Sequence, residues 1–240
     1  MKIDIVSDLH MELLNEASRA VLLKKLFSKK PRSKLLILCG DIADPSTPVY
    51  AATIARAAMR YTTVVVILGN HECYHHTVED AYAHAVKACA HIPNVIVLNN
   101  TSFEGDGFVI FGTTLWTNIV KEEKFNVACA VRDFKCIKDW SVGRHNEEHE
   151  KARAYLNTAL SDIQEARARG ITVIVATHHL PSKHLVHKDH ADSKVGSAFV
   201  CTDMDDFIEL ADVWVCGHTH KFRFYKGFST VLMCNPVGYA

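Results

Sequence analysis

Histidine, aspartate and asparagine side chains follow the ends of several short apolar runs in this sequence. The clearest example is the run Val213–Cys216, which Gly217 separates from the motif His218-Thr219-His220. In a chain with 15 histidines, one such motif can arise by coincidence. The same pattern follows four other apolar runs, where the polar residues are Asp8 and His10, Asp41, Asn70 and His71, and His178 and His179. Recurrence at five run ends favours a shared role over ordinary turn chemistry.

These residue types are typical ligands of first-row metal ions. Aspartate, asparagine and histidine supply oxygen and borderline nitrogen donors, whereas structural zinc sites favour thiolates. A single ion would use three or four of the donors. Seven donors instead suggest two ions about 3.5–4 Å apart that share one carboxylate. The donors are Asp8, His10, Asp41, Asn70, His178, His218 and His220.

Other polar residues near these motifs have competing interpretations. Glu72 is expected to be structural, because another carboxylate would crowd the site with negative charge. His179 either contacts the phosphate of a substrate or supports a metal ligand. The histidines of the segment 182–192, namely His184, His187 and His190, are either exposed loop residues or part of a substrate pocket.

The elements that must position these residues alternate between short apolar runs and longer helical patterns. Strands are predicted at Ile3–Val6, Leu35–Cys39, Val64–Leu68, Val95–Leu98, Phe108–Thr113, Ile171–Thr177, Val213–Cys216, Phe222–Tyr225 and Thr230–Cys234. Helices are predicted at Glu16–Ser28, Pro48–Tyr61, Val78–His91, Asn146–Arg169 and Thr202–Leu210. The order predicts an α/β domain with a largely parallel first sheet and a second, mixed sheet that contains hairpins at 104–107 and 226–228. The carboxyl ends of its parallel strands would bring the polar residues together.

The segment Thr117–Arg144 has weak periodicity and several charges. We expect it to leave the sheet and to form a cap over one end of a single domain that spans residues 1–240. Trp116, Arg132 and Trp140 would pack this segment or meet a substrate, and packing is the favoured interpretation.

Composition limits the partners and the compartment. The 27 basic and 27 acidic residues cancel, so net charge gives no case for duplex nucleic acid or another polyanion. The N-terminus MKIDIVSDLH lacks the apolar core of a secretory signal, and no apolar run approaches the roughly 20 residues of a membrane span. No two of the eight cysteines form a Cys-x-x-Cys pair, which favours buried reduced thiols. We therefore expect a cytoplasmic protein that makes no membrane contact.

Taken together, the motifs Asp8-x-His10, Gly40-Asp41, Gly69-Asn70-His71-Glu72, His178 and Gly217-His218-x-His220 resemble the signature motifs of calcineurin-like metallophosphoesterases. The resemblance implies a four-layer αββα sandwich of two mixed sheets flanked by helices. It also implies that Asp8, His10, Asp41 and His220 hold one metal ion, and that Asp41, Asn70, His178 and His218 hold the other. His71 matches the catalytic histidine, which would contact the phosphate with Asn70. The segments 112–117, 132–137, 197–199 and 235–239 show a weaker resemblance to a bacterial and phage-type branch of this family.

The expected activity is hydrolysis of a small phosphate ester by a hydroxide that bridges two metal ions at Asp41. Manganese is the favoured metal, and iron, zinc, nickel or cobalt would also suit these ligands. One alternative is a phosphodiesterase acting on cyclic nucleotides or short oligonucleotides. A further alternative is a non-catalytic scaffold of the same fold, but this predicts missing ligands and none is missing.

Overall fold

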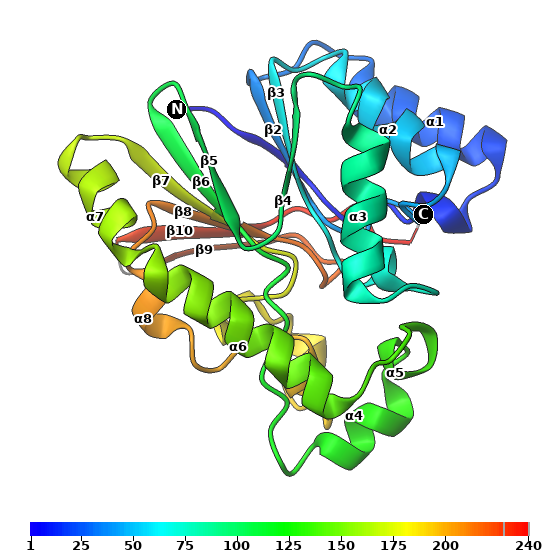
Figure 1. Ribbon diagram of the computed structural model, residues 1–240, viewed down its shortest axis with the longest axis vertical. Coiled ribbons are helices and arrows are strands. Elements are labelled where there is room, and N and C mark those ends of the chain that lie inside the picture. The colour runs from blue at the N-terminus through cyan, green and yellow to red at the C-terminus, as the bar shows by residue number, and fades with distance from the viewer. Residues whose placement is uncertain (228, 240) are drawn as a thin grey trace.

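Two stacked β-sheets form the centre of the computed structural model, which describes residues 1–227 and 229–239 (Figure 1). The first sheet is wholly parallel, with strand order β1-β2-β3-β4. Its strands are β1 (Asp4–Val6), β2 (Leu35–Cys39), β3 (Thr63–Ile67) and β4 (Val95–Leu98). Helices form the three crossover connections between these strands, as the alternating pattern of the sequence predicts. These helices are α1 (Glu16–Phe27), α2 (Pro48–Ala58) and α3 (Val78–Cys89).

The second sheet has six strands in the order β5-β6-β7-β8-β10-β9 and is mixed, because β5 and β9 are antiparallel to their neighbours. Its strands are β5 (Thr101–Gly105), β6 (Phe108–Gly112), β7 (Thr172–Ala176), β8 (Val213–Cys216), β9 (Arg223–Gly227) and β10 (Thr230–Cys234). Both predicted hairpins are present as the pairs β5–β6 and β9–β10, although Phe228 of the second turn lies outside the described residues.

Helices cover the outer face of each sheet, which completes the four predicted layers (Figure 1). Within β2, Leu36 and Leu38 pack against the helices α1 to α3, while Leu35 and Ile37 point to the second sheet. This alternation explains why the strands are apolar throughout, since both of their faces are buried. The outer face of the second sheet is covered mainly by α6 (Val142–Thr158) and α7 (Leu160–Ala168).

Two predicted helices differ from the structure, and one strand was not predicted. The helix predicted at Asn146–Arg169 begins earlier, at Val142, because Ser141 accepts a hydrogen bond from the Arg144 amide and caps it. It also breaks at Ala159 into α6 and α7, next to Thr158, whose hydroxyl donates to a backbone carbonyl of the preceding turn. The helix predicted at Thr202–Leu210 is only the short α8 (Asp205–Ile208). The strand β5 was absent from the prediction.

The segment Thr117–Arg144 leaves the sheet as expected and contains the short helices α4 (Lys124–Ala130) and α5 (Asp133–Cys136). It has a small apolar core of its own, in which Ile119, Val127 and Val131 pack against Ala198 of a distant loop. Glu123 strengthens this junction by accepting hydrogen bonds from the amide and hydroxyl of Ser197. None of the described helices is long and apolar enough to cross a membrane.

Candidate metal centre

Five loops bring the predicted ligands to the same edge of the two sheets. Asp8 and His10 follow β1, Asp41 follows β2, Asn70 follows β3, His178 follows β7, and His218 and His220 follow β8. The loops are joined by backbone hydrogen bonds, for example from the Asp8 amide to the Gly40 carbonyl (3.0 Å) and from the Gly217 amide to the His178 carbonyl (3.0 Å). The convergence predicted from the strand ends is therefore present.

Five of the seven predicted ligands have a left-handed backbone conformation, which is uncommon outside glycine. Their φ angles lie between 45° and 72°, and the residues are Asp8, His10, Asp41, His218 and His220. Such a conformation costs on the order of 1 kcal/mol and persists only where the surrounding structure enforces it. Here it turns consecutive side chains toward one place at the sheet edge.

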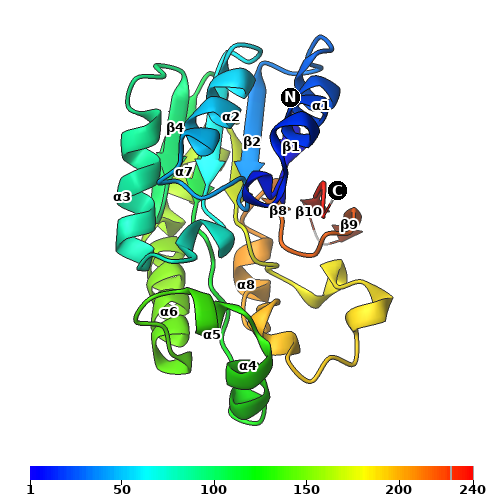
Figure 2. The same cartoon turned by 90° about the vertical axis from the view of Figure 1, so that its right-hand side faces the viewer.

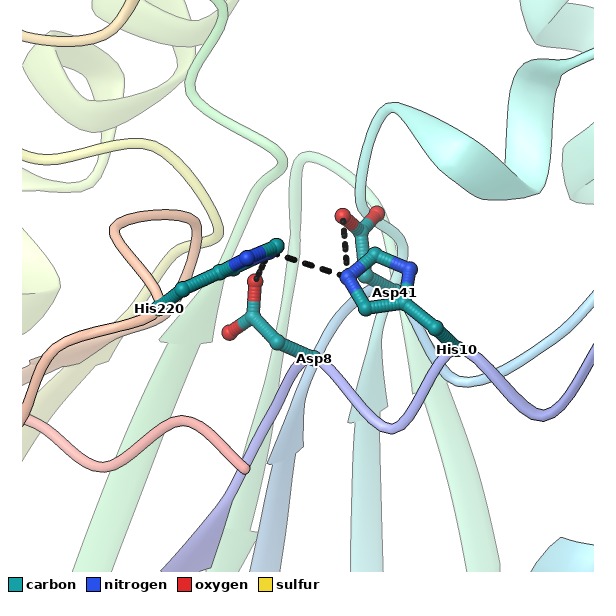
Figure 3. A group of neighbouring side chains, drawn as sticks. All are labelled: Asp8, His10, Asp41 and His220. Carbon is teal, nitrogen blue, oxygen red and sulfur yellow. Dashed lines mark hydrogen bonds and ion pairs between the residues drawn. The ribbon is translucent and has the colours of Figure 1, made fainter. Parts of the chain in front are cut away.

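The first group of side chains is Asp8, His10, Asp41 and His220 (Figure 3). His10 Nε2 lies 2.9 Å from His220 Nε2 and 3.8 Å from Asp41 Oδ2. His220 Nε2 lies 3.3 Å from Asp8 Oδ1. The carboxylates of Asp8 and Asp41 are buried, so their charges need a nearby cation.

The second group surrounds His178, whose Nδ1 lies 2.7 Å from the Cys39 carbonyl oxygen and must donate its proton there. In neutral His178, Nε2 then carries a lone pair, and it faces Asn70 Oδ1 at 3.0 Å, His218 Nδ1 at 3.1 Å and Asp41 Oδ2 at 3.5 Å. Carboxylate and amide oxygens have no proton to offer it, so the arrangement requires a positive charge among them, either a proton on His178 Nε2 or a bound metal ion.

Electrostatics lead to the same conclusion. Burial lowers the pKa of His178, but the Asp41 carboxylate, together with Asp8 and the Cys39 carbonyl, outweighs burial and raises that pKa to about 10. Burial also raises the pKa of Asp41, but His178 and His71 outweigh it and hold that pKa well below its usual range. Positive charge is thus strongly favoured at the point where Asp41 Oδ2 faces both His10 and His178. The oxygen and imidazole donors of the two groups fit a pair of first-row metal ions that share Asp41.

Glu72 holds two of the ligand loops together. Its carboxylate accepts hydrogen bonds from the amides of Gly69 (2.8 Å), Asp41 (2.9 Å) and Ile42 (2.7 Å). The approach is so close that a Cβ atom on Gly69 would lie 2.2 Å from Asp41 Oδ1. The structural role predicted for Glu72 agrees with these contacts.

His71 lies beside the first group of ligands and lines the same pocket. Its Nδ1 is 3.1 Å from Glu12 Oε1, its ring stacks on Tyr74 at 4.3 Å, and its centroid is 4.4 Å from that of His10. Glu12 also approaches His10 Nδ1 at 3.4 Å. Burial lowers the pKa of His71, but Asp41 and Glu12 outweigh it and raise that pKa above its ordinary value. Sequence reasoning missed Glu12, which lies two residues after His10 in the 3-10 turn Met11–Leu13.

Asp133 is a second residue that the sequence prediction missed. It is buried, and its carboxylate accepts hydrogen bonds from Asn70 Nδ2 (2.8 Å) and the Tyr74 hydroxyl (2.9 Å). The bond from Nδ2 fixes the Asn70 amide so that its Oδ1 faces His178. The one sequence feature that included Asp133 was the resemblance of residues 132–137 to a bacterial and phage-type branch of the family. That resemblance assigned no role to this aspartate.

His179 is fully buried and lies behind the ligands. Its ring centroid is 4.3 Å from that of His218 and 5.0 Å from that of Trp116, and it is not among the residues that line the pocket. The placement favours the alternative in which His179 supports a ligand. Trp116 and Trp140 pack against each other at 4.5 Å, as expected.

A pocket of about 800 Å³ opens over the two groups of ligands. Its floor includes Asp41, Asn70 and His71, and one wall is formed by residues 130–133 of the segment Thr117–Arg144. Another wall comes from the loop 183–200, where His187 and His190 line the pocket. His184 instead stacks on Tyr225 at 4.2 Å. Tyr239, near the end of the chain, completes the lining and contacts the rings of His10 and His220.

Known proteins share this sequence pattern and this fold. A sequence model described as calcineurin-like phosphoesterase matches residues 1–222. An uncharacterised protein of Acanthamoeba polyphaga mimivirus is 26% identical over 252 residues, covering 98% of this chain and 90% of that protein. A phosphopantetheinyl hydrolase from Mycobacterium tuberculosis is 18% identical with a TM-score of 0.73, covering 99% of this chain and 89% of that one. A dimetal phosphatase from Danio rerio is 12% identical with a TM-score of 0.61, covering 97% and 86%.

Proposed function

This chain belongs to the calcineurin-like phosphoesterase family, and on that basis we propose that it hydrolyses phosphate esters at a centre of two metal ions. The observation that carries the proposal is the double role of Asp41 Oδ2, which lies 3.8 Å from His10 Nε2 in one group and 3.5 Å from His178 Nε2 in the other. One carboxylate oxygen between two sets of donors is the arrangement that a shared ligand requires.

The ligands divide between the two sites as follows. Asp8, His10, Asp41 and His220 hold one ion, and Asp41, Asn70, His178 and His218 hold the other. The first set is supported by ligand atoms that all lie within 4.8 Å of one another, as do those of Asp41, His178 and His218 in the second set. Asn70 joins the second set through its Oδ1, 3.0 Å from His178 Nε2. Manganese suits these oxygen and imidazole donors, as do iron, zinc, nickel and cobalt.

When bound, the two ions would neutralise phosphoryl oxygens and lower the pKa of a water molecule, so no nucleophile from the protein is needed. The chain's own residues position and polarise the substrate. Asn70, fixed by Asp133, and His71 present polar groups to the pocket floor, and Glu72 holds their loop against that of Asp41.

His71 acts as the general acid that protonates the leaving oxygen. It lines the pocket, and the carboxylate of Glu12 accepts a hydrogen bond from its Nδ1, which leaves Nε2 for proton transfer. A raised pKa supports this role, because the protonated form must be populated before it can donate.

The segment Thr117–Arg144 caps the site within a single domain. Ala130, Val131, Arg132 and Asp133 line the pocket from this segment, opposite the strand-end loops. A pocket of about 800 Å³ is large enough for a substrate group on each side of the reacting phosphorus. This favours a phosphodiesterase as the second candidate function, beside a phosphomonoesterase.

The two candidates and a non-catalytic scaffold are separated by one experiment. The manganese-loaded protein is assayed with p-nitrophenyl phosphate, bis(p-nitrophenyl) phosphate, cyclic nucleotides and a phosphopantetheinyl compound, with Asp41→Asn as the control. Turnover that is lost in Asp41→Asn supports the proposal, and the preferred substrate assigns it to monoesters or diesters. A metal-loaded protein that turns over none of these compounds would favour the scaffold.

A further inference from the structure

A strong local excess of positive charge lies on one face of this formally neutral chain. Between Arg19 and Asp41 the sequence contains six basic residues and no acidic residue. They end α1 and form its connection to β2. Hydrogen bonds from Ser33 to the Lys2 carbonyl (2.6 Å) and from Arg60 to the Lys29 carbonyl (3.1 Å) bring two further cations to the same place. We call this set the basic face; it consists of Lys2, Lys24, Lys25, Lys29, Lys30, Arg32, Lys34 and Arg60.

The basic face is not neutralised by the protein itself. The lysines and arginines that form ion pairs within the described residues are Arg144, Lys151, Arg153, Arg167 and Arg169, and none belongs to the basic face. Asp4 lines the groove that begins at the basic face and places one negative charge among these cations, where its carboxylate accepts hydrogen bonds from the Arg32 amide and the Tyr61 hydroxyl. The exposed charges of the basic face are therefore available to an anionic partner.

A groove of about 370 Å³ begins at the basic face and follows the edge strand β1. Lys29, Lys30, Arg32 and Tyr61 line one end of it, and Phe222 and Asn235 line the other. Figure 2 shows α1, β1, β9 and β10 on the same side of the molecule. Asn235 follows β10 at its carboxyl end, so the groove leads toward the edge where the candidate metal centre lies.

Exposed aromatic residues continue along the neighbouring edge strand. Phe222 is 63% exposed and Phe224 is 53% exposed. Phe222 directly precedes β9 and Phe224 lies within it, and because they are two residues apart their side chains share one face of the extended chain. Their spacing along an extended chain is roughly 7 Å. Phe222 follows His220, a proposed ligand, by only two residues. Lys221 and Lys226 flank the aromatic pair and are also exposed.

We propose that this groove binds a single-stranded nucleic acid and directs it toward the metal centre. Its phosphates would contact the basic face, and its bases would stack on Phe222 and Phe224. Stacking on aromatic residues beside a positively charged groove is the general mode by which proteins bind single strands. The inference rests on the proposed function, for which it specifies the substrate class. A concave groove suits a strand better than a lipid surface, and a phosphoester is the bond that the nearby centre would hydrolyse.

The test is binding of the manganese-loaded protein to a fluorescein-labelled single strand of about 12 nucleotides with phosphorothioate linkages, which slow its hydrolysis. Anisotropy is measured at several salt concentrations with RNA, DNA and a duplex of the same sequence. Replacing Lys29, Lys30 and Arg32 by Gln should weaken single-strand binding by about tenfold or more and reduce the slope of log K against log salt by about 2. Phe222→Ala should weaken it by roughly tenfold.

A matched control replaces three exposed lysines elsewhere, Lys87, Lys121 and Lys124, by Gln. This variant changes net charge equally and should bind the single strand as the unaltered chain does. Equal weakening by the control, no single-strand binding, or tighter binding of the duplex than of the single strand would overturn the inference. Hydrolysis of p-nitrophenyl phosphate and bis(p-nitrophenyl) phosphate by the unaltered chain reports the proposed function separately. Turnover without strand binding contradicts only the nucleic-acid groove, and strand binding without turnover contradicts only the proposed function.

Discussion

Each key side chain of the candidate centre is held by a partner from another loop. Glu72 binds the backbone of Asp41 from the loop after β3, and Asp133 of α5 fixes the amide of Asn70. Glu12 faces His71 across 59 positions of sequence. Such partners orient the groups that contact metal or substrate, so their replacement should change activity without removing a ligand.

Replacement of His71 by Ala isolates its proposed role as a general acid. The variant should keep both metal ions and lose about 10² to 10⁴ in rate on alkyl phosphates, with a smaller loss on nitrophenyl phosphate, whose leaving group needs no proton. The measurement compares kcat/KM for the two ester classes together with metal content. Equal losses on both classes would favour pure charge stabilisation, and loss of a metal ion would make His71 a ligand.

Glu12→Gln provides the companion test, because it keeps the shape of the side chain and removes the charge beside His71. We expect a smaller loss than in His71→Ala, with the same dependence on the leaving group. The rate on nitrophenyl phosphate and the metal content should stay close to those of the unaltered chain. A loss of similar size on both ester classes would mean that Glu12 serves the fold rather than His71.

The convergence of the proposed ligands at one sheet edge was predictable from the sequence, but two of the residues that hold them, Glu12 and Asp133, were not. Asp8, His10 and His220 stand in short motifs directly after apolar strands, so their shared location follows from the parallel sheet. Glu12 and Asp133 have no such signal. Asp133 lies 63 residues from Asn70, and only the folded path of the segment Thr117–Arg144 brings the two together. The similarity to a bacterial and phage-type branch stays a prediction.

Among the elements, strands buried on both faces were predicted better than exposed ones. β2 and β6 are buried at every position, and they appear in the sequence as continuous apolar runs. β5 is mostly exposed, and Phe103 is its one large apolar residue, so its pairing with β6 determines its conformation. The helix break at Ala159 was also not predicted, because no proline or glycine lies at this position to indicate it.

The proposed cap is tested by Arg132→Gln. Arg132 is an exposed residue of the pocket wall, with its guanidinium 5.8 Å from the centre of the Tyr74 ring. Because the side chain meets the substrate side of the pocket, the variant should change KM by about threefold to tenfold for some substrates of the panel and leave metal content unchanged. Lys135→Gln, also in this segment but outside the pocket lining, is the matched control. Unchanged relative rates across the panel would make the segment purely structural.

The junction between the cap and α6 predicts a pH-dependent stability. His145 is buried against Trp116 and Trp140, and burial, with a contribution from His149, lowers its pKa from 6.5 to about 3. Between these values the unfolded chain binds a proton that the folded chain rejects. The free energy of unfolding should therefore fall as pH decreases from 6.5 toward 3, by about 1.4 kcal/mol per pH unit from this group.

His145→Gln removes this titration and can still accept the hydrogen bonds from Thr117. Urea unfolding at pH 5 and pH 7.5 should show a smaller dependence on pH in this variant than in the unaltered chain. Replacement of the exposed His91 by Gln serves as the control and should leave the dependence unchanged. The same pH dependence in all three proteins would contradict the account of His145.

At the scale of the whole molecule, the net charge and the number of histidines do not show which of these residues the fold brings together. A formal charge of zero gave no reason to expect an anionic partner, yet the basic face gathers cations from α1, the N-terminal residues and the end of α2. In the same way, 15 histidines spread along the sequence include five that meet at one sheet edge as proposed ligands or as the general acid next to them. They are His10, His71, His178, His218 and His220.

The number of metal ions bound per chain tests the central claim most directly. The purified protein is saturated with manganese, freed of loosely bound metal, and analysed for metal content alongside hydrolysis of p-nitrophenyl phosphate. Two ions per chain are expected, with Asp41→Asn losing both together and about 10² or more in activity, because its carboxylate serves both sites. One ion per chain at saturation, with full activity, would contradict the two-metal centre.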